Sequence, residues 1–298
     1  MAEPPTVRES NQEVGMKKSL LVLLTCLAMV FAFTACGSSE EEAAAPEEST
    51  EVIVFAAASM QSSLEELEAS FEAENPGVDV VLNCDSSGTL EEQILEGAPC
   101  DIFFSAAQKN MDNLEAEGLV VEGTRSNVLN NQLVVITQPD SETAVTGIEN
   151  LGDAESIALA DGSVPVGKYT RRALMNLGVL AEVEDPAVYT TQEVSDALGG
   201  VEISEQGNVS KVLAAVQEGS SEVGTVYLSD TYGQEDSVKI LETVSYDVAG
   251  DIIYPIAQIV NQDADDAENE AAAAVLEYLT NDNAKSVYET HLFDIDVE

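Results

Sequence analysis

Residues 52–59 read VIVFAAAS, a run of seven apolar residues that ends at Ser59. A run that is apolar on both faces is typical of a central parallel strand that helices cover on either side. A helical pattern of leucines and glutamates follows at once, so Ser59 is expected at the start of a helix. The stretch therefore predicts an α/β fold in which Ser59 lies at the carboxyl end of a strand, where open α/β sheets bind ligands.

The composition supports this fold class and excludes two kinds of partner. Of the 298 residues, 45% are hydrophobic and only 5% are aromatic, which suits helices packed on parallel strands better than an aromatic-rich β-sandwich. The formal net charge is -45, from 56 acidic and 11 basic side chains. Such a charge argues against nucleic acid and against an anionic membrane surface as partners. An anionic ligand would need short-range donors, because the acidic surface repels anions at longer range.

The N-terminal region resembles a lipoprotein leader. Lys17 and Lys18 precede an apolar run that reaches Phe33, and translation is expected to begin at Met16. Residues 33–37 read FTACG and are similar to the lipobox of bacterial lipoproteins, in which Cys36 would be acylated, although Phe33 stands where a smaller aliphatic residue is usual. Residues 1–35 are therefore interpreted as upstream residues and a signal peptide. The alternative is a transmembrane anchor that is retained whole.

A flexible, acidic tether is expected between the lipid anchor and the folded part. Residues 36–50 are low in complexity, rich in Glu and Ala, and offer nothing to bury. With the lipobox, this predicts a protein that lies outside the cytoplasm and is anchored to the cell membrane by a lipid.

Three strand–helix units follow the tether and predict the first lobe. Strands are expected at 52–58, 78–82 and 100–105, and each leads into an amphipathic helix. Units of this kind in series predict a parallel sheet with right-handed connections. The second unit repeats the plan of the first, because Ser87 lies in a hydroxyl-rich loop just before a helix. Residues 51–133 are assigned to lobe 1, with a further strand at 133–136.

The second half of the chain predicts another lobe and a return to the first. Strands are expected at 157–160, 223–228 and 252–260 and helices at 169–177 and 209–216, whereas 181–208 shows no clear pattern apart from a short helix near 193–198. Pro255 marks its strand as an edge or a crossing segment. Residues 134–254 are assigned to lobe 2, and 255–298 to lobe 1, on which helices at 271–279 and 283–289 are expected to pack.

Several residues have a simpler structural interpretation than a functional one. Cys84 and Cys100 are placed at opposite edges of a sheet, so a disulfide between them is not expected. The acidic run at 263–268 lacks the spacing of a calcium loop and is interpreted as a helix start. His291, the one histidine, is interpreted as a surface or packing residue.

Taken as a set, several stretches resemble one family, the molybdate-binding receptors of molybdate ATP-binding-cassette importers. The resemblance covers residues 51–298, although the family usually has Ala where Cys100 stands. It implies a two-lobed periplasmic-binding-protein fold of type II, with a mainly parallel sheet in each lobe and two crossing strands between them. The matching stretches are VFAAAS at 54–59, SSGTL at 86–90, GAPCDIFFSA at 97–106 with QK at 108–109, VPVGKY at 164–169, NV at 208–209 and GTVY at 224–227.

The resemblance also implies a ligand, a partner and a site. The ligand is molybdate or tungstate, the partner is the importer's permease, and the receptor is a monomer without a cofactor or a bound metal cation. In the family pattern, the ligand-binding positions are occupied here by Ser59, Ser87, Val166, Val209 and Tyr227. The two serines use hydroxyl and backbone N–H groups, the two valines use backbone N–H groups, and Tyr227 uses its phenol.

The residues themselves support an oxyanion site. Ser59, Ser87, Val166 and Val209 each lie at or just before an expected helix start, where free N–H groups and the helix dipole favour an anion. A site made only of donors is expected to reject phosphate, whose bound proton needs an acceptor, while sulfate stays open as a ligand. Two further hypotheses stay open as well: a hydrolase with Ser59 as nucleophile, and a basic pocket around Lys168, Arg171 and Arg172.

Overall fold

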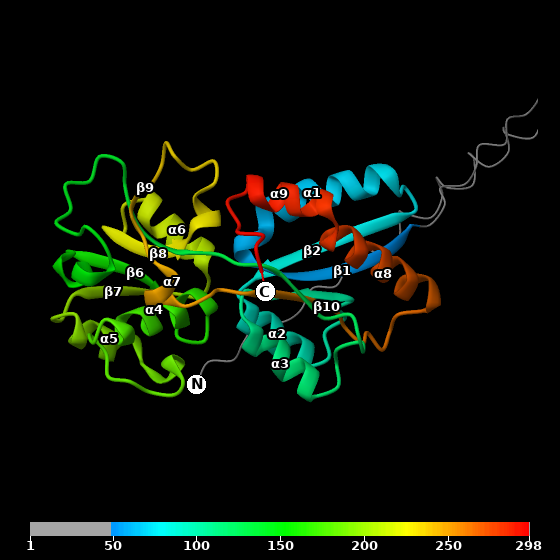
Figure 1. Cartoon of the computed structure of the whole chain (residues 1–298), viewed down its shortest axis with the longest axis horizontal. Helices are drawn as coiled ribbons and strands as arrows, with labels where there is room; N and C mark the ends of the chain where they lie inside the picture. Colours follow the sequence, from blue (N-terminus) through cyan, green and yellow to red (C-terminus); the bar gives the residue numbers. More distant parts are fainter. Residues whose placement is uncertain (1–48, 298) are drawn as a thin grey trace, which may run out of the picture. The chain divides into compact units, whose positions relative to one another are not determined.

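Two five-stranded sheets, each flanked by helices, form the folded part of the chain in a computed structural model that describes residues 49–297 (Figure 1). We call the first sheet and its helices lobe 1, and the second sheet and its helices lobe 2. The expected signal peptide, Cys36 and nearly all of the expected tether lie outside the described residues.

The sheet of lobe 1 is built around the strand that contains the apolar run. The strands are β1 (Thr50–Ala57), β2 (Val78–Asp85), β3 (Ile102–Phe104), β4 (Ser126–Leu129) and β10 (Tyr254–Gln258), in the order β2-β1-β3-β10-β4. β1 pairs in parallel with β2 and with β3, as the three strand–helix units predicted. β10 is antiparallel to both of its neighbours.

The sheet of lobe 2 has a similar plan. Its strands are β5 (Leu133–Thr137), β6 (Ser156–Ala160), β7 (Glu202–Gln206), β8 (Val223–Tyr227) and β9 (Lys239–Thr243), in the order β7-β6-β8-β5-β9. β6 is parallel to β7 and β8, whereas β5 is antiparallel to β8 and β9. Both sheets are therefore mixed rather than mainly parallel, because the first strand after each crossing, β5 in lobe 2 and β10 in lobe 1, runs against the others.

Helices cover both faces of each sheet. In lobe 1, α2 and α3 lie on one face, while α1, α8 and α9 lie on the other. Both faces of β1 are therefore buried. Val54 packs on the side of α1, α8 and α9, and Phe55 packs on the side of α2 and α3. The helices are α1 (Gln61–Glu74), α2 (Ser87–Leu95), α3 (Gln108–Ala116), α4 (Pro165–Asn176), α5 (Thr191–Ala197), α6 (Val209–Gln217), α7 (Tyr246–Ala249), α8 (Asp266–Thr280) and α9 (Asp282–Thr290), with short 3₁₀ helices η1 (Ala58–Met60), η2 (Ile148–Asp153), η3 (Pro186–Val188) and η4 (Leu228–Thr231).

The chain crosses from lobe 1 to lobe 2 between β4 and β5 and returns between β9 and β10. Asn131 in the first crossing donates through Nδ2 to Tyr254 Oη at 3.1 Å, at the end of the second crossing. The same amide donates to Ser229 Oγ of lobe 2 at 2.8 Å. Buried hydrogen bonds therefore tie the two crossings to each other and to lobe 2 beside the place where the lobes meet.

Pro255 is a correction to the sequence analysis. β10 is not an edge strand, because it lies between β3 and β4. Its ladder with β4 shifts register between Tyr254 and Pro255, so the missing N–H falls at an irregularity where a proline is tolerated. On the other side the Pro255 carbonyl accepts from Ser105 N at 3.0 Å.

Three strands, β4, β7 and β9, and the short helix α7 were not expected. β7 lies in the unassigned segment 181–208 and carries mostly polar side chains, because it is the outer strand of its sheet. β9 is the other outer strand, and β4 has only four residues. Edge strands need not be apolar on both faces, so periodicity does not reveal them. No helix within residues 49–297 has both the length and the apolar character needed to span a membrane.

Candidate functional site

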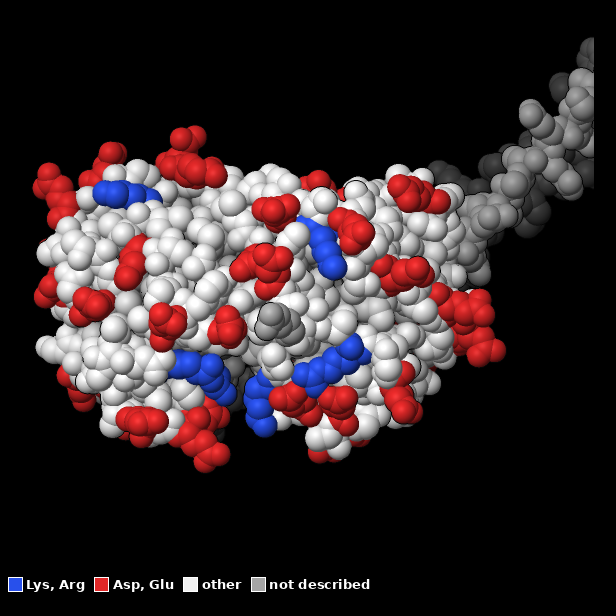
Figure 2. Space-filling view, in the orientation of Figure 1, with Lys and Arg blue, Asp and Glu red and all other residues white. Residues whose placement is uncertain are grey.

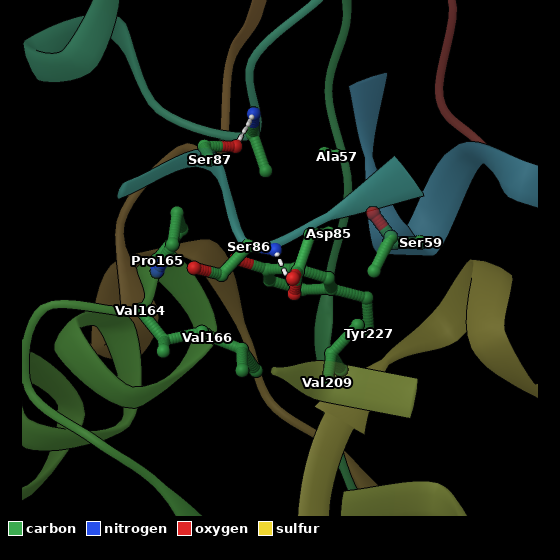
Figure 3. Close-up of a pocket in the computed structure, with 12 residues that line it drawn as sticks. Ala57, Ser59, Asp85, Ser86, Ser87, Val164, Pro165, Val166, Val209 and Tyr227 are labelled. Atoms are coloured by element: carbon green, nitrogen blue, oxygen red, sulfur yellow. Dashed lines mark hydrogen bonds between the residues drawn. The ribbon is translucent and has the colours of Figure 1, made fainter. Parts of the chain in front are cut away.

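One pocket brings the ends of elements from both lobes together (Figure 3). It encloses about 10 Å³, far below the roughly 300–1,000 Å³ of pockets that hold organic ligands, so it suits a compact ligand. All five residues that were expected to contact the ligand line it. The complete lining is Ala57, Ala58, Ser59, Asp85, Ser86, Ser87, Ala106, Val164, Pro165, Val166, Val209 and Tyr227.

The start of α2 presents Ser87 to the pocket. Ser86, rather than Ser87, is the N-cap, and its Oγ accepts from Thr89 N at 3.1 Å. That bond satisfies the third N–H group of the helix, so the N–H groups of Ser87 and Gly88 have no partner within the helix. The Ser87 hydroxyl oxygen accepts from Ala106 N at 2.9 Å, which leaves its proton free to be donated.

The starts of α4 and α6 present backbone groups of lobe 2. In α6, Asn208 is the N-cap and its Oδ1 accepts from Lys211 N at 3.0 Å, so Val209 is the first residue of the helix with an unpaired N–H. In α4 the first position is Pro165, which has no N–H. The first available N–H group of α4 is therefore that of Val166, which explains how an apolar residue can serve a polar site.

Tyr227 supplies a phenol that has no hydrogen-bond partner within residues 49–297. The residue ends β8 and is 1% exposed, and its Oη is buried without a hydrogen-bond partner among the described residues. A buried, unpaired hydroxyl costs about 1–3 kcal/mol of stability, which is offset if a ligand accepts from it. Burial, followed by the neighbouring Tyr254 and other acidic groups, raises the pKa of Tyr227 well above its ordinary value, so the phenol stays protonated and remains a donor.

Ser59 is oriented from the crossing segments. It is buried in η1, between β1 and α1, and its Oγ lies 2.8 Å from Tyr254 Oη. Because Tyr254 Oη accepts from Asn131 Nδ2, its own proton can be donated to Ser59 Oγ, which frees the Ser59 proton for the pocket. Sequence reasoning missed both Tyr254 and Asn131, since neither lies near Ser59 in the chain.

Asp85 also lines the pocket, although the sequence analysis did not name it as a site residue, and it corrects the expectation of a site made only of donors. The sequence analysis described a site made only of donors, yet the Asp85 carboxylate lines the pocket. Its Oδ1 accepts from Ser86 N at 2.7 Å and from Asn208 Nδ2 at 2.8 Å. Through this one oxygen the carboxylate accepts from a donor of each lobe, as Figure 3 shows for the bond from Ser86.

The basic side chains that were considered as an alternative anion site have other roles. Arg171 is fully buried and donates to the carbonyls of Ala160, Gly167 and Tyr189, at 2.9, 3.0 and 2.9 Å. Lys168 pairs with Asp185 at 2.8 Å. None of the residues that line the pocket is Lys or Arg.

The third residue of that group, Arg172, stacks on the Tyr169 ring, with its guanidinium carbon 5.4 Å from the ring centroid. On the face shown in Figure 2, acidic side chains are widely spread and far outnumber the basic ones. An anion that enters the pocket therefore meets neutral donors there rather than a cationic side chain.

Asp230 lies directly behind Tyr227. Its Oδ2 accepts from Tyr227 N at 2.8 Å, at the start of η4. Burial raises the pKa of this carboxyl to about 7, although the hydrogen bond from Tyr227 N acts in the opposite direction. Asp230 therefore positions the Tyr227 backbone and is a titratable group close to the site.

Ser59 has no histidine base beside it. The His291 ring bonds to Ser62 Oγ at 3.1 Å and to Glu66 Oε2 at 2.9 Å, and it stacks on Tyr232. His291 is thus a buried packing residue rather than part of a triad, in which a base must lie within reach of the nucleophile.

The two lobes and the polar pocket between them define a class of protein. Residues 52–294 match the family of bacterial extracellular solute-binding proteins, and the chain belongs to this family. It is therefore a solute-binding protein rather than a hydrolase.

The Escherichia coli molybdate-binding protein ModA is 31% identical over 248 residues, which cover 80% of this chain and 86% of the relative. YvgL of Bacillus subtilis, named as an ABC transporter substrate-binding lipoprotein, is 30% identical over 237 residues, 79% of this chain and 83% of the relative.

Solved structures agree on the fold. The substrate-binding domain described for a molybdenum ABC transporter from Clostridium difficile has a TM-score of 0.59 at 31% identity, and the match covers 83% of this chain and 99% of that one. The periplasmic molybdate-binding protein of Azotobacter vinelandii has a TM-score of 0.67 at 21% identity, over 83% of this chain and all of that one. The two-lobed periplasmic-binding-protein fold is thereby confirmed.

Proposed function

We propose that this protein binds molybdate or tungstate in the pocket between its lobes and delivers it to an ABC importer. The observation that carries the proposal is the buried Tyr227 Oη, which has no partner in the part of the chain that the structure describes. It lies in a small cavity onto which the starts of α2, α4 and α6 converge. Neutral donors aimed from several directions suit a compact oxyanion. The molybdate-binding relatives point to the same kind of ligand.

The proposed contacts come from both lobes. Ser59 and Ser87 of lobe 1 donate through hydroxyl and backbone N–H groups, Val166 and Val209 of lobe 2 through backbone N–H groups, and Tyr227 through its phenol. Each element that delivers a donor is anchored in a sheet or begins a helix, so the donors are held in place before the ligand arrives. No cofactor is needed for this role, and the metal enters only as the central atom of the bound oxyanion.

Selection among oxyanions follows from charge and size. Phosphate keeps a proton near neutral pH and needs an acceptor, whereas the proposed contacts are donors. Asp85, the one carboxylate in the lining, already accepts through Oδ1 from Ser86 and Asn208, so only its Oδ2 could take that proton. Sulfate carries no proton and is smaller than molybdate, so donors placed for the larger ion hold it less well. We therefore expect tight binding of molybdate and tungstate and weak binding of sulfate and phosphate.

Isothermal titration calorimetry with these four anions tests the proposal. The expected result is one site per chain for molybdate and tungstate, with sulfate and phosphate weaker by at least about two orders of magnitude, which corresponds to roughly 2.7 kcal/mol. Equal or tighter binding of sulfate would make the protein a sulfate receptor. Binding of none of the four would refute the proposed ligand class.

We also propose that the protein is attached to the outside of the cell membrane through a lipid on Cys36. The lipobox-like sequence at 33–37 supports this, and so does the lipoprotein name of the Bacillus subtilis relative. In this account the chain upstream of Cys36 is removed, the acidic tether spans the gap to lobe 1, and a monomer docks on the permease. Cys36→Ser should abolish labelling by a radioactive fatty acid. A variant that is still labelled and membrane-bound would favour a retained transmembrane anchor instead.

A further inference from the structure

We infer that Asp85 and Asn208 form a latch between the lobes, so that this pair governs how long the bound oxyanion stays in the pocket. The inference rests on the proposed function for the identity of the ligand, but on a contact of its own for the mechanism. Asn208 Nδ2 donates to Asp85 Oδ1 at 2.8 Å. Asp85 ends β2 of lobe 1, and Asn208 is the N-cap of α6 in lobe 2.

Both side chains are held in place from within their own lobes. Asp85 Oδ1 also accepts from Ser86 N at 2.7 Å, and Asn208 Oδ1 accepts from Lys211 N at 3.0 Å. Each group is therefore aimed before the lobes meet, and little side-chain entropy is lost when the bond between them forms. Only the Asn208 amide and the accepting Asp85 oxygen have to come together.

The hydrogen bond between Asp85 and Asn208 should form at the same time as the protein donors of the two lobes close around the oxyanion. Ser86 and Ser87 follow Asp85 directly, and Val209 follows Asn208. Movement of α6 toward α2 therefore brings together both the donors on the ligand and the two latch side chains. The bond between the latch residues does not involve the ligand, so it adds stability to the closed arrangement on its own account.

A second contact shows that the lobes fit closely at this point. A Cβ atom added to Gly88, in the first turn of α2, would lie 3.0 Å from the carbonyl oxygen of Ser163, in the loop of lobe 2 that precedes α4. The two backbones approach so closely that a side chain at Gly88 would force one of them to shift by a few tenths of an ångström. The latch thus spans a tightly packed junction, in which a hydrogen bond to a carboxylate is partly shielded from water.

A hydrogen bond that forms only as the lobes close should affect release rather than capture. Encounter takes place with the lobes apart, so its rate does not depend on a bond made afterwards. Release requires the bond to break, so its loss should raise the dissociation rate constant, which is where most affinity differences between related complexes arise.

Three variants and a matched control isolate the pair. Asn208→Ser keeps an N-cap side chain for α6 but removes the amide donor. Asn208→Asp also keeps the cap and places a second carboxylate against Asp85, and Asp85→Asn combined with Asn208→Asp exchanges donor and acceptor. Asn281→Ser is the control, since Asn281 caps α9 through a 2.8 Å bond from Ala284 N to its Oδ1, away from the junction.

Stopped-flow dissociation of molybdate gives the first readout. Asn208→Ser should raise the dissociation rate constant roughly tenfold, the effect of about 1.4 kcal/mol, while the association rate constant stays within about twofold of wild type. Asn208→Asp should release molybdate faster still, because two carboxylates then face each other. The exchanged pair should recover most of that loss, and Asn281→Ser should match the wild type.

A second readout needs no ligand and so separates this inference from the proposed function. Single-molecule energy transfer between dyes on cysteines introduced at Glu117 of lobe 1 and Glu184 of lobe 2, both exposed, reports the closed fraction. Cys26 and Cys36 are replaced by Ser in the labelled protein. Burial raises the pKa of the native Cys84 thiol to about 12 and raises that of Cys100 as well, so the introduced thiols react selectively. Asn208→Asp should lower the closed fraction, and the exchanged pair should restore it.

The outcomes are distinct. If the wild type bound none of the four oxyanions, the proposed ligand would be wrong, and the closed fraction without ligand would still decide the latch. If Asn208→Ser released molybdate at the wild-type rate, or if the exchanged pair did no better than Asn208→Asp in either readout, the latch would be overturned.

Discussion

The two lobes supply the pocket with different kinds of donor. In the site that we propose, lobe 1 contributes the hydroxyls of Ser59 and Ser87 as well as backbone groups, whereas lobe 2 contributes the N–H groups of Val166 and Val209 and a single phenol, that of Tyr227. A hydroxyl depends on which side chain is present, while a backbone donor depends only on where a helix begins. Lobe 1 should therefore be sensitive to side-chain truncation, and lobe 2 largely insensitive to it except at Tyr227.

The largest effect is expected from removing one backbone donor of lobe 2. Val209→Pro deletes a single N–H group at the first position of α6, where proline is tolerated, and the extended backbone of Asn208 before it (φ -160°, ψ 172°) is compatible with a following proline. Molybdate affinity measured by calorimetry should fall roughly tenfold to hundredfold, because a hydrogen bond to an anion is lost.

The matched control for this variant is Val209→Ala, which keeps the N–H group but shortens the same buried side chain. Its affinity should stay within about threefold of the wild type, although its thermal stability should fall slightly. A loss of binding in Val209→Ala as large as in Val209→Pro would mean that lobe 2 acts through side-chain packing rather than through backbone donors.

Tyr227→Phe tests the one side chain through which lobe 2 is expected to act. Affinity for molybdate should fall roughly tenfold or more, because the phenol is a donor to a charged ligand. The melting temperature of the ligand-free protein should stay the same or rise, since the deleted hydroxyl is buried without a partner among the described residues. A stability loss with unchanged affinity would show that Tyr227 is only a packing residue.

The serines of lobe 1 should combine a binding effect with a stability effect. Ser87→Ala should weaken molybdate binding roughly tenfold, and it should also destabilise the ligand-free protein by about 1–2 kcal/mol, since Ala106 N loses its acceptor. Ser59→Ala should behave similarly, because it leaves Tyr254 Oη without one partner. Calorimetry and urea unfolding of both variants measure the two effects, and wild-type affinity in both would place the site elsewhere.

The Asp230 carboxyl, next to Tyr227, predicts that the stability of the folded protein depends on pH. Burial raises the pKa of this carboxyl from 3.8 to about 7 in the folded protein. As the pH rises, the Asp230 carboxyl loses its proton at a lower pH in the unfolded chain than in the folded protein, so binding of this proton stabilises the folded state. The stabilisation is fully present below about pH 3.8 and is lost as the pH rises through 7.

Asp230→Asn has no proton to lose, and its amide oxygen can still accept from Tyr227 N. Urea unfolding should show that the free energy of unfolding of the wild type, relative to this variant, declines by on the order of a few kcal/mol between about pH 4 and pH 7 and then levels off. A difference that did not change with pH would contradict the buried position of the carboxyl.

Salt is expected to have the smallest effect. Raising sodium chloride from about 0.1 M to about 0.5 M should change molybdate affinity by less than about threefold, because short-range neutral donors in an enclosed pocket are weakly screened. A steep fall in affinity with salt, measured in the same calorimeter, would point instead to cations at the pocket rim, such as Lys168.

The strands that carry continuous apolar runs were predictable because burial on both faces leaves a mark on the sequence. β1, β5, β6 and β8 agree with the expected positions to within a few residues, as do α1 and α4, the amphipathic helices that were expected after β1 and β6. β7 and β9 could not be found in the same way, because outer strands carry exposed polar side chains. The place of Pro255 in a strand paired on both sides depended on a shift of register that no local pattern indicates.

The pocket itself was partly predictable. All five ligand positions came from the resemblance. Expected helix starts supported Ser59, Ser87, Val166 and Val209, whereas Tyr227 rested on the resemblance alone. Asp85, Asn131, the Asn208 side chain and Tyr254 were missed as site residues. Their roles arise from contacts across 123 to 195 positions of the chain, and each alone is an ordinary polar residue.

By itself, the sequence determined the α/β class, the three strand–helix units from β1 to α3 in lobe 1, and the kind of group that each helix start can offer, because these depend on local periodicity and capping. Only the tertiary structure decided which helix starts face one another, that Tyr227 Oη is buried without a partner among the described residues, and that an Asp85 carboxylate lines a pocket for an anion. Those features depend on how two lobes, built from distant parts of the chain, meet at the crossing segments. Contacts of that kind are set by packing over the whole fold, and no local stretch of sequence encodes them.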